Sequence, residues 1–137
     1  MFAAILLLTT TAVAPQSMLK LDLICTLTAL SLRRGGALPE GIPIKNNVRT
    51  HLRLDLEAKR WCQEECLWRA NLEADDDHIG LKHLDEGPAM RWTDQISRTT
   101  GTRMTVAMSG AGGTESGMLE VSQCEPAPFT GFPATKF

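Results

Sequence analysis

The amino-acid sequence predicts an all-β fold: a single-domain antiparallel meander of about seven strands, closed or half-closed into a barrel or packed as a sandwich. Apolar and polar residues alternate with a period of two in several short segments. These segments recur about every 10–15 residues, and turns rich in glycine, proline or aspartate separate them. With 137 residues, of which 43% are apolar and 22% charged, the chain is long enough for one folded core.

The first strand is expected over residues 18–32, where apolar side chains occupy every second position of the first half. Residues 33–47 are rich in glycine and proline and are expected to form a long loop. The next strand, over residues 48–56, shows the clearest alternation in the chain. Leu52 and Leu54 point to one face, and charged side chains point to the other.

Residues 57–66 allow two interpretations. By propensity the segment is helical, and Trp61, Cys62 and Cys66 would share one stripe of that helix. By context it links two strands, and a local disulfide would narrow it into a hairpin-like connection. We expect the hairpin-like connection, with one short helix as the alternative.

The second half of the chain is expected to hold five more strands, over residues 68–72, 79–81, 90–96, 104–108 and 118–124. Residues 99–102 are expected to form a glycine-containing hairpin loop. The tail from residue 125 to residue 137 contains three prolines and cannot form a helix. We expect it to be an ordered strap, with Phe129 and Phe132 covering the core.

Four methionines fall on the expected core faces of these strands: Met90, Met104, Met108 and Met118. Because methionine adapts to irregular space, such a set can line an apolar pocket, or it can simply fill a core.

Residues 1–14 have the layout of a secretory signal peptide, with an apolar run from Phe2 to Leu8 followed by a small-x-small tripeptide. The run is too short to cross a bilayer. We therefore expect a mature domain of residues 15–137 without a transmembrane segment, located in the periplasm or secreted. A buried N-terminal strand is the alternative interpretation of residues 1–14.

The chain has four cysteines, and an even number in a small exported protein predicts two disulfides with three possible connectivities. Cys62 and Cys66 are close enough in sequence to bridge locally. The remaining pair, Cys25 and Cys124, would join the first strand to the last. A zinc site is a poorer interpretation, because the only close pair has C-x3-C spacing.

Four motifs span most of the mature chain: LDLIC at 21–25, W-C-x-x-x-C at 61–66, W-x-x-x-I-x-R-x-T-G at 92–101, and CEPAPFTGFP at 124–133. In these motifs the chain resembles small exported, disulfide-containing bacterial proteins of unknown function. The resemblance implies a β-fold, disulfides and export, and it implies no activity.

The side chains that could bind a metal do not have the spacing of known sites. His51, His78 and His83 form neither H-x-H nor H-x3-H, so we expect solvated histidines. Residues 75–86 have acidic residues at some calcium-loop positions, but Ile79 occupies a position that needs an oxygen ligand. We expect a turn followed by a strand there, with no metal and no cofactor.

No catalytic motif is present in the sequence. Ser109 lacks the G-x-S-x-G context of a hydrolase nucleophile, and the glycine-rich residues 110–117 lack the ending of a phosphate-binding loop. The cysteines are expected to be consumed in disulfides. We expect no catalytic residue, and the hairpin tip is the simplest interpretation of the glycine-rich segment.

The charge of the chain argues against binding to nucleic acid, because the net charge is -2 and such proteins carry a basic excess. Five basic residues could form a modest basic patch, but we expect them to be solvated surface residues: Arg33, Arg34, Lys45, Arg49 and Arg53.

The sequence favours a non-catalytic, exported binding or interaction protein, taking a small apolar ligand in a barrel mouth or contacting an envelope protein. Two alternatives remain open: a small envelope hydrolase assembled from loops, and a protease-inhibitor-like protein that presents residues 33–47.

Overall fold

The computed structural model describes residues 19–34, 42–43, 47–110 and 115–133, and within these ranges the chain consists of strands and their connections. The expected signal peptide lies outside the described residues. The strands are β1 (Lys20–Arg34), β2 (Ile42–Pro43), β3 (Arg49–Asp55), β4 (Arg60–Gln63), β5 (Ala70–Ala74), β6 (His78–Leu81), β7 (Met90–Ser97), β8 (Thr102–Ser109) and β9 (Ser116–Ala127).

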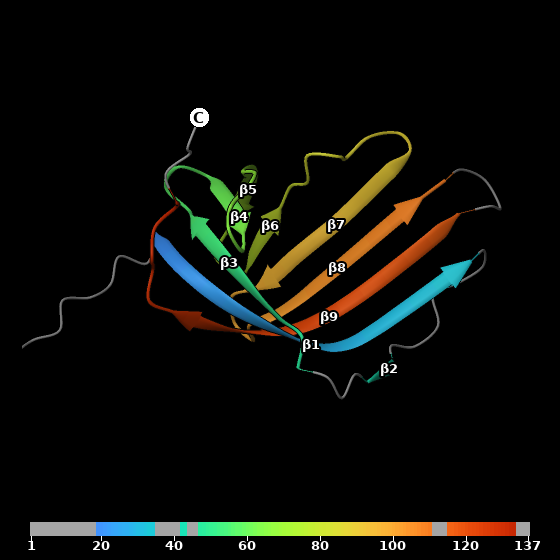
Figure 1. The fold of residues 1–137 in the computed structure, drawn as a ribbon, viewed down its shortest axis with the longest axis horizontal. Coiled ribbons are helices and arrows are strands. Elements are labelled where there is room, and N and C mark those ends of the chain that lie inside the picture. Colours follow the sequence, from blue (N-terminus) through green and yellow to red (C-terminus); the bar gives the residue numbers. More distant parts are fainter. Residues whose placement is uncertain (1–18, 35–41, 44–46, 111–114, 134–137) are drawn as a thin grey trace, which may run out of the picture.

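Eight of the strands close into an antiparallel barrel (Figure 1). From β3 onward each strand pairs with the next one in the chain, and β1 pairs with both β3 and β9, which closes the ring. The ninth strand, β2, is a two-residue addition beside the middle of β1, within the segment expected to be a loop. The predicted all-β closed barrel is confirmed, with one barrel strand more than expected.

The additional strand is β4, within residues 57–66, and the alternative of a short helix there is wrong. Trp61 lies opposite Leu54 of β3 and is fully buried, so this segment contributes a core residue to the sheet. Three residues in it, Lys59, Glu64 and Cys66, have φ angles of 53°, 51° and 55°, which are incompatible with a right-handed helix. Tertiary burial of the tryptophan therefore overrides helix propensity.

The four cysteines pair as predicted. Cys25 of β1 lies directly opposite Cys124 of β9, with 3.9 Å between their Cα atoms, at the point where the barrel closes. Cys62 and Cys66 form the second disulfide at the end of β4, with their Cα atoms 5.1 Å apart. One disulfide thus joins the first and last strands of the barrel, and the other restrains the connection between β4 and β5.

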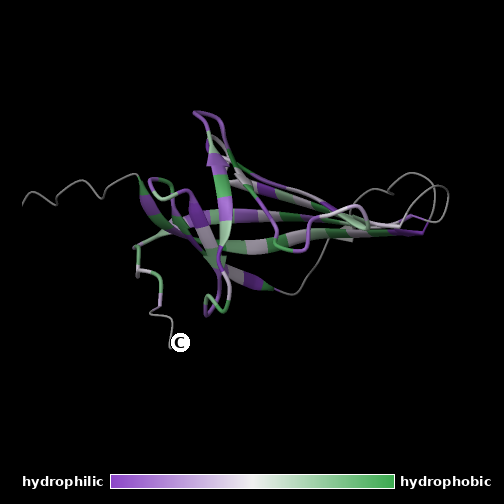
Figure 2. Ribbon diagram, turned by 90° about the horizontal axis from the view of Figure 1, so that it is seen from above, coloured by the Kyte–Doolittle hydropathy of each residue, from purple (hydrophilic) through white to green (hydrophobic). Residues whose placement is uncertain are grey.

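The hydrophobic core fills the part of the barrel enclosed by β3–β6 and the facing halves of the longer strands. Leu52, Leu54 and Trp61 have no exposed surface, as the alternation in the sequence predicts. Figure 2 shows the alternation of hydrophilic and hydrophobic residues along the strands. The remaining members of the cluster are Leu23, Cys25, Ala70, Leu72, Ile79, Leu81, Ile96 and Cys124.

Four strands are longer than the rest and extend beyond the enclosed core (Figures 1 and 2). Pairing between β1 and β3 ends at Thr26, and pairing between β6 and β7 reaches only Gln95. Residues 27–34, 90–94, 105–109 and 116–121 therefore form a curved four-stranded layer, which we call the extension. Among the described residues, no strand faces its inner side.

Residues 128–133 form an ordered strap, as predicted, but the strap crosses the outside of the barrel. Thr130 and Gly131 accept hydrogen bonds from Arg53 of β3 at 2.6 and 2.7 Å. Phe129 and Phe132 are half-buried and contact each other, with ring centroids 6.0 Å apart, and neither joins the core cluster. The expectation that these phenylalanines cover the core is therefore wrong.

Candidate functional site

A cavity of about 330 Å3 opens at the end of the barrel where β1 begins and β9 ends. Its walls are mainly apolar, and most of these side chains belong to the core or pack against it. The lining residues are Lys20, Leu21, Leu23, Leu56, Ile79, Ile96, Ser97, Arg98, Gly101, Cys124, Pro126 and Ala127. Both its volume and its composition are typical of sites for small molecules.

Two cations lie among these lining residues. The Lys20 ammonium is 3.6 Å from the Asp55 carboxylate, which is a weak pairing for a lysine that is 45% exposed. Arg98, on the β7–β8 turn, donates one hydrogen bond of 2.6 Å to the carbonyl of Asp75. Both groups retain further donors, because an ammonium has three N–H groups and a guanidinium has five.

The turn beside the cavity requires a glycine. Gly101 has a φ of 72°, and a Cβ atom at this position would lie 2.6 Å from the carbonyl oxygen of Cys124. The Gly101 amide donates to Ser97 and its carbonyl accepts from the amide of Cys124, which fixes the β7–β8 turn against β9. The glycine-containing hairpin loop expected here is confirmed.

A second constellation, of polar side chains, lies inside the barrel near the extension. The Asp94 carboxylate accepts from Arg103 Nε and Nη2 at 2.9 and 2.6 Å and from the Thr105 hydroxyl at 3.1 Å. His83 Nε2 lies 2.9 Å from the same carboxylate. Burial by itself raises the pKa of Asp94, but the hydrogen bonds from Arg103 and His83 outweigh it and hold that pKa below its ordinary value.

Aromatic rings connect this polar cluster to the core. The ring of His83 stacks on Trp92, with centroids 4.1 Å apart and an interplanar angle of 7°. The ring of His83 also meets Trp61 edge to face, with centroids 5.4 Å apart, and Trp61 in turn contacts Trp68 edge to face at 4.9 Å. The imidazole is thus held between two tryptophans, and both oxygens of Asp94 are occupied. This arrangement fixes the orientations of His83 and Arg103 inside the barrel.

A third polar contact ties the strap to the barrel. The Asp22 side chain is fully buried on the outer face of β1, and its Oδ2 accepts from the Thr130 hydroxyl at 2.6 Å and contacts His51 Nε2 at 2.8 Å. Asp22 Oδ1 has no hydrogen-bond partner among the described residues. Asp22 is therefore buried because the strap covers it, which the sequence did not indicate.

The expectation of solvated histidines is wrong for two of the three. His51 and His83 are 25% and 14% exposed, and each contacts a fully buried aspartate, Asp22 and Asp94 respectively. Only His78 is exposed. A signal was available for Asp94, which shares the inner face of β7 with Ile96, where a buried carboxylate needs a partner. No such signal existed for Asp22, because the alternation places it on the outer face of β1.

The acidic segment after β5 forms a turn followed by strand β6, as expected. Asp75 Oδ1 accepts from the amides of Asp77 and His78 at 2.8 and 2.7 Å. These two amide hydrogen bonds lower the pKa of Asp75. Within the described part of the chain, no group of three or more His, Cys, Asp or Glu side chains is placed to hold a metal ion.

The methionines divide between the two faces of the sheet. Met90 and Met118 lie on the inner side of the extension and line a shallow hollow of about 220 Å3. Met104 is 49% exposed on the outer face, and Met108 contacts Gly117 on that face as well. The expectation that all four lie on core faces is therefore wrong for the two methionines of β8.

The remaining candidates have structural contacts or lie outside the described residues. Arg33 pairs with Glu115 at 3.3 Å, and Arg53 holds the strap. Ser109 ends β8, but the tip of the glycine-rich hairpin, residues 111–114, is outside the described residues. So are Lys45 and most of residues 33–47, the segment of the inhibitor alternative.

The chain matches no family model, no curated protein and no solved structure. Across the described ranges, no helix has the length and apolar character needed to cross a membrane. The two disulfides are compatible with an oxidising or extracellular compartment. The cavity and the inner polar cluster are therefore the features of the molecule that bear on its function.

Proposed function

We propose that the protein is a non-catalytic, exported binding protein, and that a small apolar molecule occupies the cavity at the end of its barrel. The observation that carries this proposal is the apolar wall of that cavity, built from Leu21, Leu56 and Ile79 together with core residues. An apolar molecule placed there would remove these side chains from water, which is the main favourable contribution to binding at such sites.

The two cations beside the cavity favour a ligand with an acidic group at one end. Lys20 and Arg98 both retain free donors, and their present partners are weak or neutral. A carboxylate or sulfonate would accept charge-assisted hydrogen bonds from them. The preferred ligand class is therefore an apolar molecule that carries one anionic group.

The hydrolase alternative finds less support in the inner polar cluster. Arg103, His83 and Thr105 together occupy both oxygens of Asp94. A general base needs a free lone pair within reach of its substrate. The satisfied carboxylate fits a role in holding β7 to β8 better than a role in proton transfer.

The test is titration with 8-anilinonaphthalene-1-sulfonate, an apolar sulfonate whose fluorescence rises in an apolar site. We expect saturable binding with one site per chain. Leu56→Glu places a carboxylate at the cavity wall, which costs about 1–3 kcal/mol when unpaired. This corresponds to an affinity about 5- to 150-fold weaker.

Leu84→Glu is the matched control, because Leu84 is 68% exposed and does not line the cavity. It should leave the affinity unchanged, and circular dichroism should show that both variants are folded. Absence of saturable binding to the wild type, or equal loss in both variants, would contradict the proposal.

Export, the other half of the proposal, is supported by the pattern in residues 1–14 and by the two disulfides. The mass of the protein recovered from the periplasm or medium of its host should lack this segment. Recovery of the chain with Met1 intact from the cytoplasmic fraction would exclude export.

A further inference from the structure

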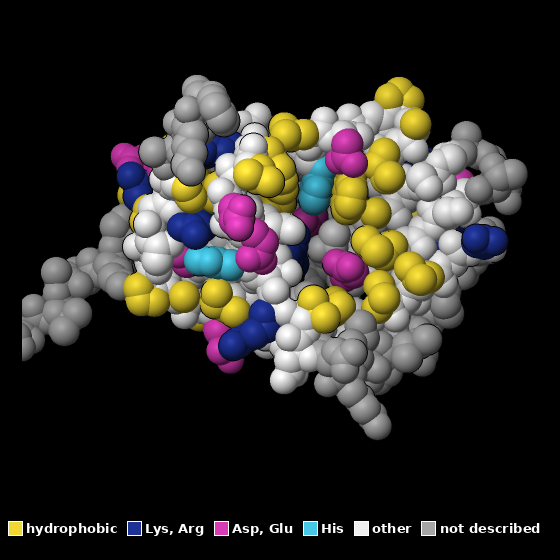
Figure 3. Space-filling view, viewed as in Figure 1, with side chains coloured by type: hydrophobic (Ala, Val, Ile, Leu, Met, Phe, Trp, Pro, Cys, Tyr) yellow, Lys and Arg dark blue, Asp and Glu magenta, His cyan; other side chains and the backbone are white. Residues whose placement is uncertain are grey.

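The inner side of the extension is a second surface, at the opposite ends of the strands from the cavity. Apolar side chains from all four strands lie on it: Leu30, Leu32, Met90, Trp92, Ala107 and Met118. Leu32 is 64% exposed. Figure 3 shows hydrophobic side chains, a histidine and acidic side chains gathered around a hollow over β7–β9. We call this surface the concave face.

One carboxylate, that of Glu120, lies among these apolar residues. Glu120 is opposite Thr105 of β8 and Leu30 of β1, so the register places it on the concave face. Glu120 is half-buried, yet no hydrogen bond or ion pair joins its carboxylate to any of the described residues. Its neighbours on this face are apolar on one side, Leu30 and Met118, and polar on the other, Thr105 and Ser122. A half-buried carboxylate without a hydrogen-bond donor is unfavourable unless a cation or donor approaches it.

The nearby cations are already engaged. Arg103 donates two hydrogen bonds to Asp94, and both Arg33 and Arg91 pair with Glu115. Arg34 lies opposite Ser116, which places it on the concave face as well, at the far end of β1. It is exposed and four residues from Leu30, about 13 Å along the strand, and no ion pair joins it to Glu120. The charge of Glu120 is therefore not compensated within the described structure.

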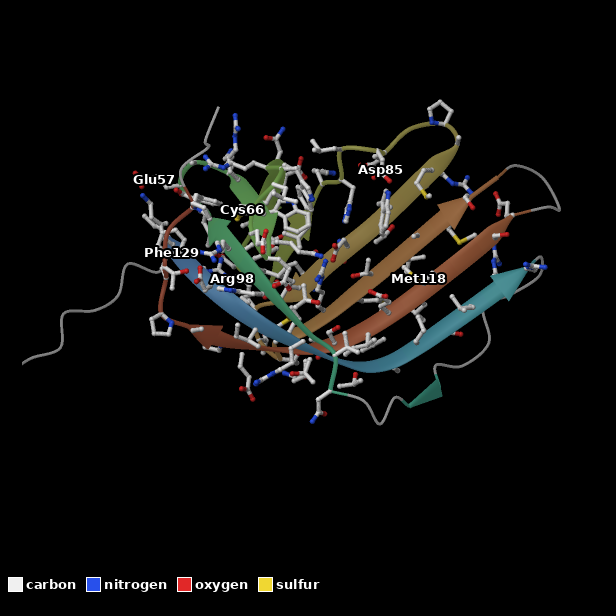
Figure 4. All side chains as sticks on the ribbon, in the orientation of Figure 1. Glu57, Cys66, Asp85, Arg98, Met118 and Phe129 are labelled. Carbon is white, nitrogen blue, oxygen red and sulfur yellow. A yellow bond between two sulfur atoms is a disulfide. The ribbon has the colours of Figure 1, made fainter. Side chains whose placement is uncertain are left out.

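The rim of the concave face adds further negative charge. Asp85 and Glu86 are exposed on the β6–β7 connection, and no ion pair to either is formed by the described residues. Figure 4 shows Asp85 on that connection and Met118 on β9, on either side of the face. The concave face thus combines a wide apolar surface with acidic groups at its centre and edge.

We propose that the concave face docks a segment of a partner protein that presents a lysine or arginine between apolar side chains. The cationic head would pair with Glu120, and its aliphatic stem would pack on Leu30 and Met118. Trp92 stacks one face of its ring on His83, and the other face would contact the same cation. The acidic rim would attract such a segment before contact.

The breadth of the face favours a protein segment over a small organic cation. Four strands at about 4.8 Å spacing give a surface wider than a small cation can cover. Small cations are held by enclosing aromatic cages, whereas Trp92 is the single tryptophan among the side chains placed on this face. Apolar side chains on both sides of the cation would cover Leu32 and Met90.

The experiment is selection of a random twelve-residue peptide library against the full mature protein, followed by affinity measurement on the consensus peptide. We expect selected peptides to share one lysine or arginine flanked by apolar residues. Glu120→Gln should weaken the consensus peptide by about tenfold or more, because it removes one partner of a charge pair.

Glu125→Gln is the matched control, since Glu125 is an exposed carboxylate on the outer face of the same strand. It should leave the affinity unchanged. A charge exchange adds a test independent of stability: Glu120→Lys should bind a peptide in which the basic residue is replaced by glutamate.

Three results would overturn the proposal. Selected peptides without a shared basic residue, or with affinities insensitive to Glu120→Gln, would remove its basis. Arginine methyl ester binding as tightly as the consensus peptide would show a site for small cations instead. Concentration-dependent dimers of the wild type that disappear in Glu120→Gln would show that a second copy occupies the face. None of these results depends on the end cavity.

Discussion

The two disulfides should contribute very differently to stability, although both are cross-links of the same chemistry. The perturbation is paired replacement by alanine, in one variant at Cys25 and Cys124 and in the other at Cys62 and Cys66. Both pairs are largely buried, with no residue above 8% exposure, so the two variants lose comparable packing. The difference between them therefore reports mainly on the covalent link.

The magnitude follows from the length of chain that each bridge closes. The Cys25–Cys124 bridge spans a separation of 99 residues, and the other spans 4. In the chain-entropy model a loop of about 100 residues contributes about 4.7 kcal/mol at 25 °C, and a loop of about four contributes about 1.9 kcal/mol. We expect the first variant to lose roughly 3 kcal/mol more than the second.

The assay is urea denaturation followed by tryptophan fluorescence, with the free energy of unfolding extrapolated to water. The variant without the Cys25–Cys124 bridge should also show a steeper dependence on urea, because its unfolded chain is less compact and exposes more surface. Equal losses in the two variants, or a larger loss on removal of the Cys62–Cys66 bridge, would refute the reasoning from loop length.

Three further predictions concern the polar cluster, the strap and the core. Asp94→Asn should cost about 3–5 kcal/mol at pH 7, because it leaves the buried Arg103 unpaired. Because the pKa of Asp94 is lowered in the folded state, the contribution of its carboxylate to the free energy of unfolding is present above a pH of about 4 and is lost as the pH falls further. The difference in urea midpoint between wild type and variant should therefore shrink in acid. A difference that stays constant with pH would exclude the ion pair as its cause. Thr130→Val should cost about 1–3 kcal/mol by removing a hydrogen bond to buried Asp22, and limited proteolysis should then cut the tail faster, whereas unchanged cleavage would argue against a fixed strap. Leu54→Ala should cost about 2–5 kcal/mol in the same urea assay, since Leu54 has no exposed surface, and a loss below 1 kcal/mol would contradict its place in the core.

The sequence was informative wherever strict alternation coincided with apolar side chains. Leu52 and Leu54 reach the core because a period of two separates them from the charged residues between them. The cysteine pairing followed from the same logic, since Cys25 shares the apolar face of β1 and a closed meander makes first and last strands neighbours. Local pattern and global closure agree in these elements.

The helix alternative for residues 57–66 failed because burial of one residue decided the local structure. Residues 57–66 have helical propensity, yet Trp61 is inserted between β3 and β5 and its indole donates to the carbonyl of Lys82 at 3.0 Å. Propensity cannot report this contact because it involves a residue more than twenty positions away. For the same reason the sequence does not indicate the burial of Asp22, since the strap that buries it comes from the other end of the chain.

The hydrophobicity of strand β8 does not predict the inner polar cluster. Its apolar positions, including Met104, form one face, and Arg103 and Thr105 lie on the other, so hydrophobicity alone turns the strand the wrong way round. The β7–β8 turn fixes the register through Gly101, and that register places Arg103 opposite Ile96, on the inside. Asp94 was the available signal: it shares the inner face of β7 with Ile96, and a buried carboxylate needs donors from the neighbouring strand. Reading β7 and β8 as a pair assigns Arg103 and Thr105 to the interior and Met104 to the outer face.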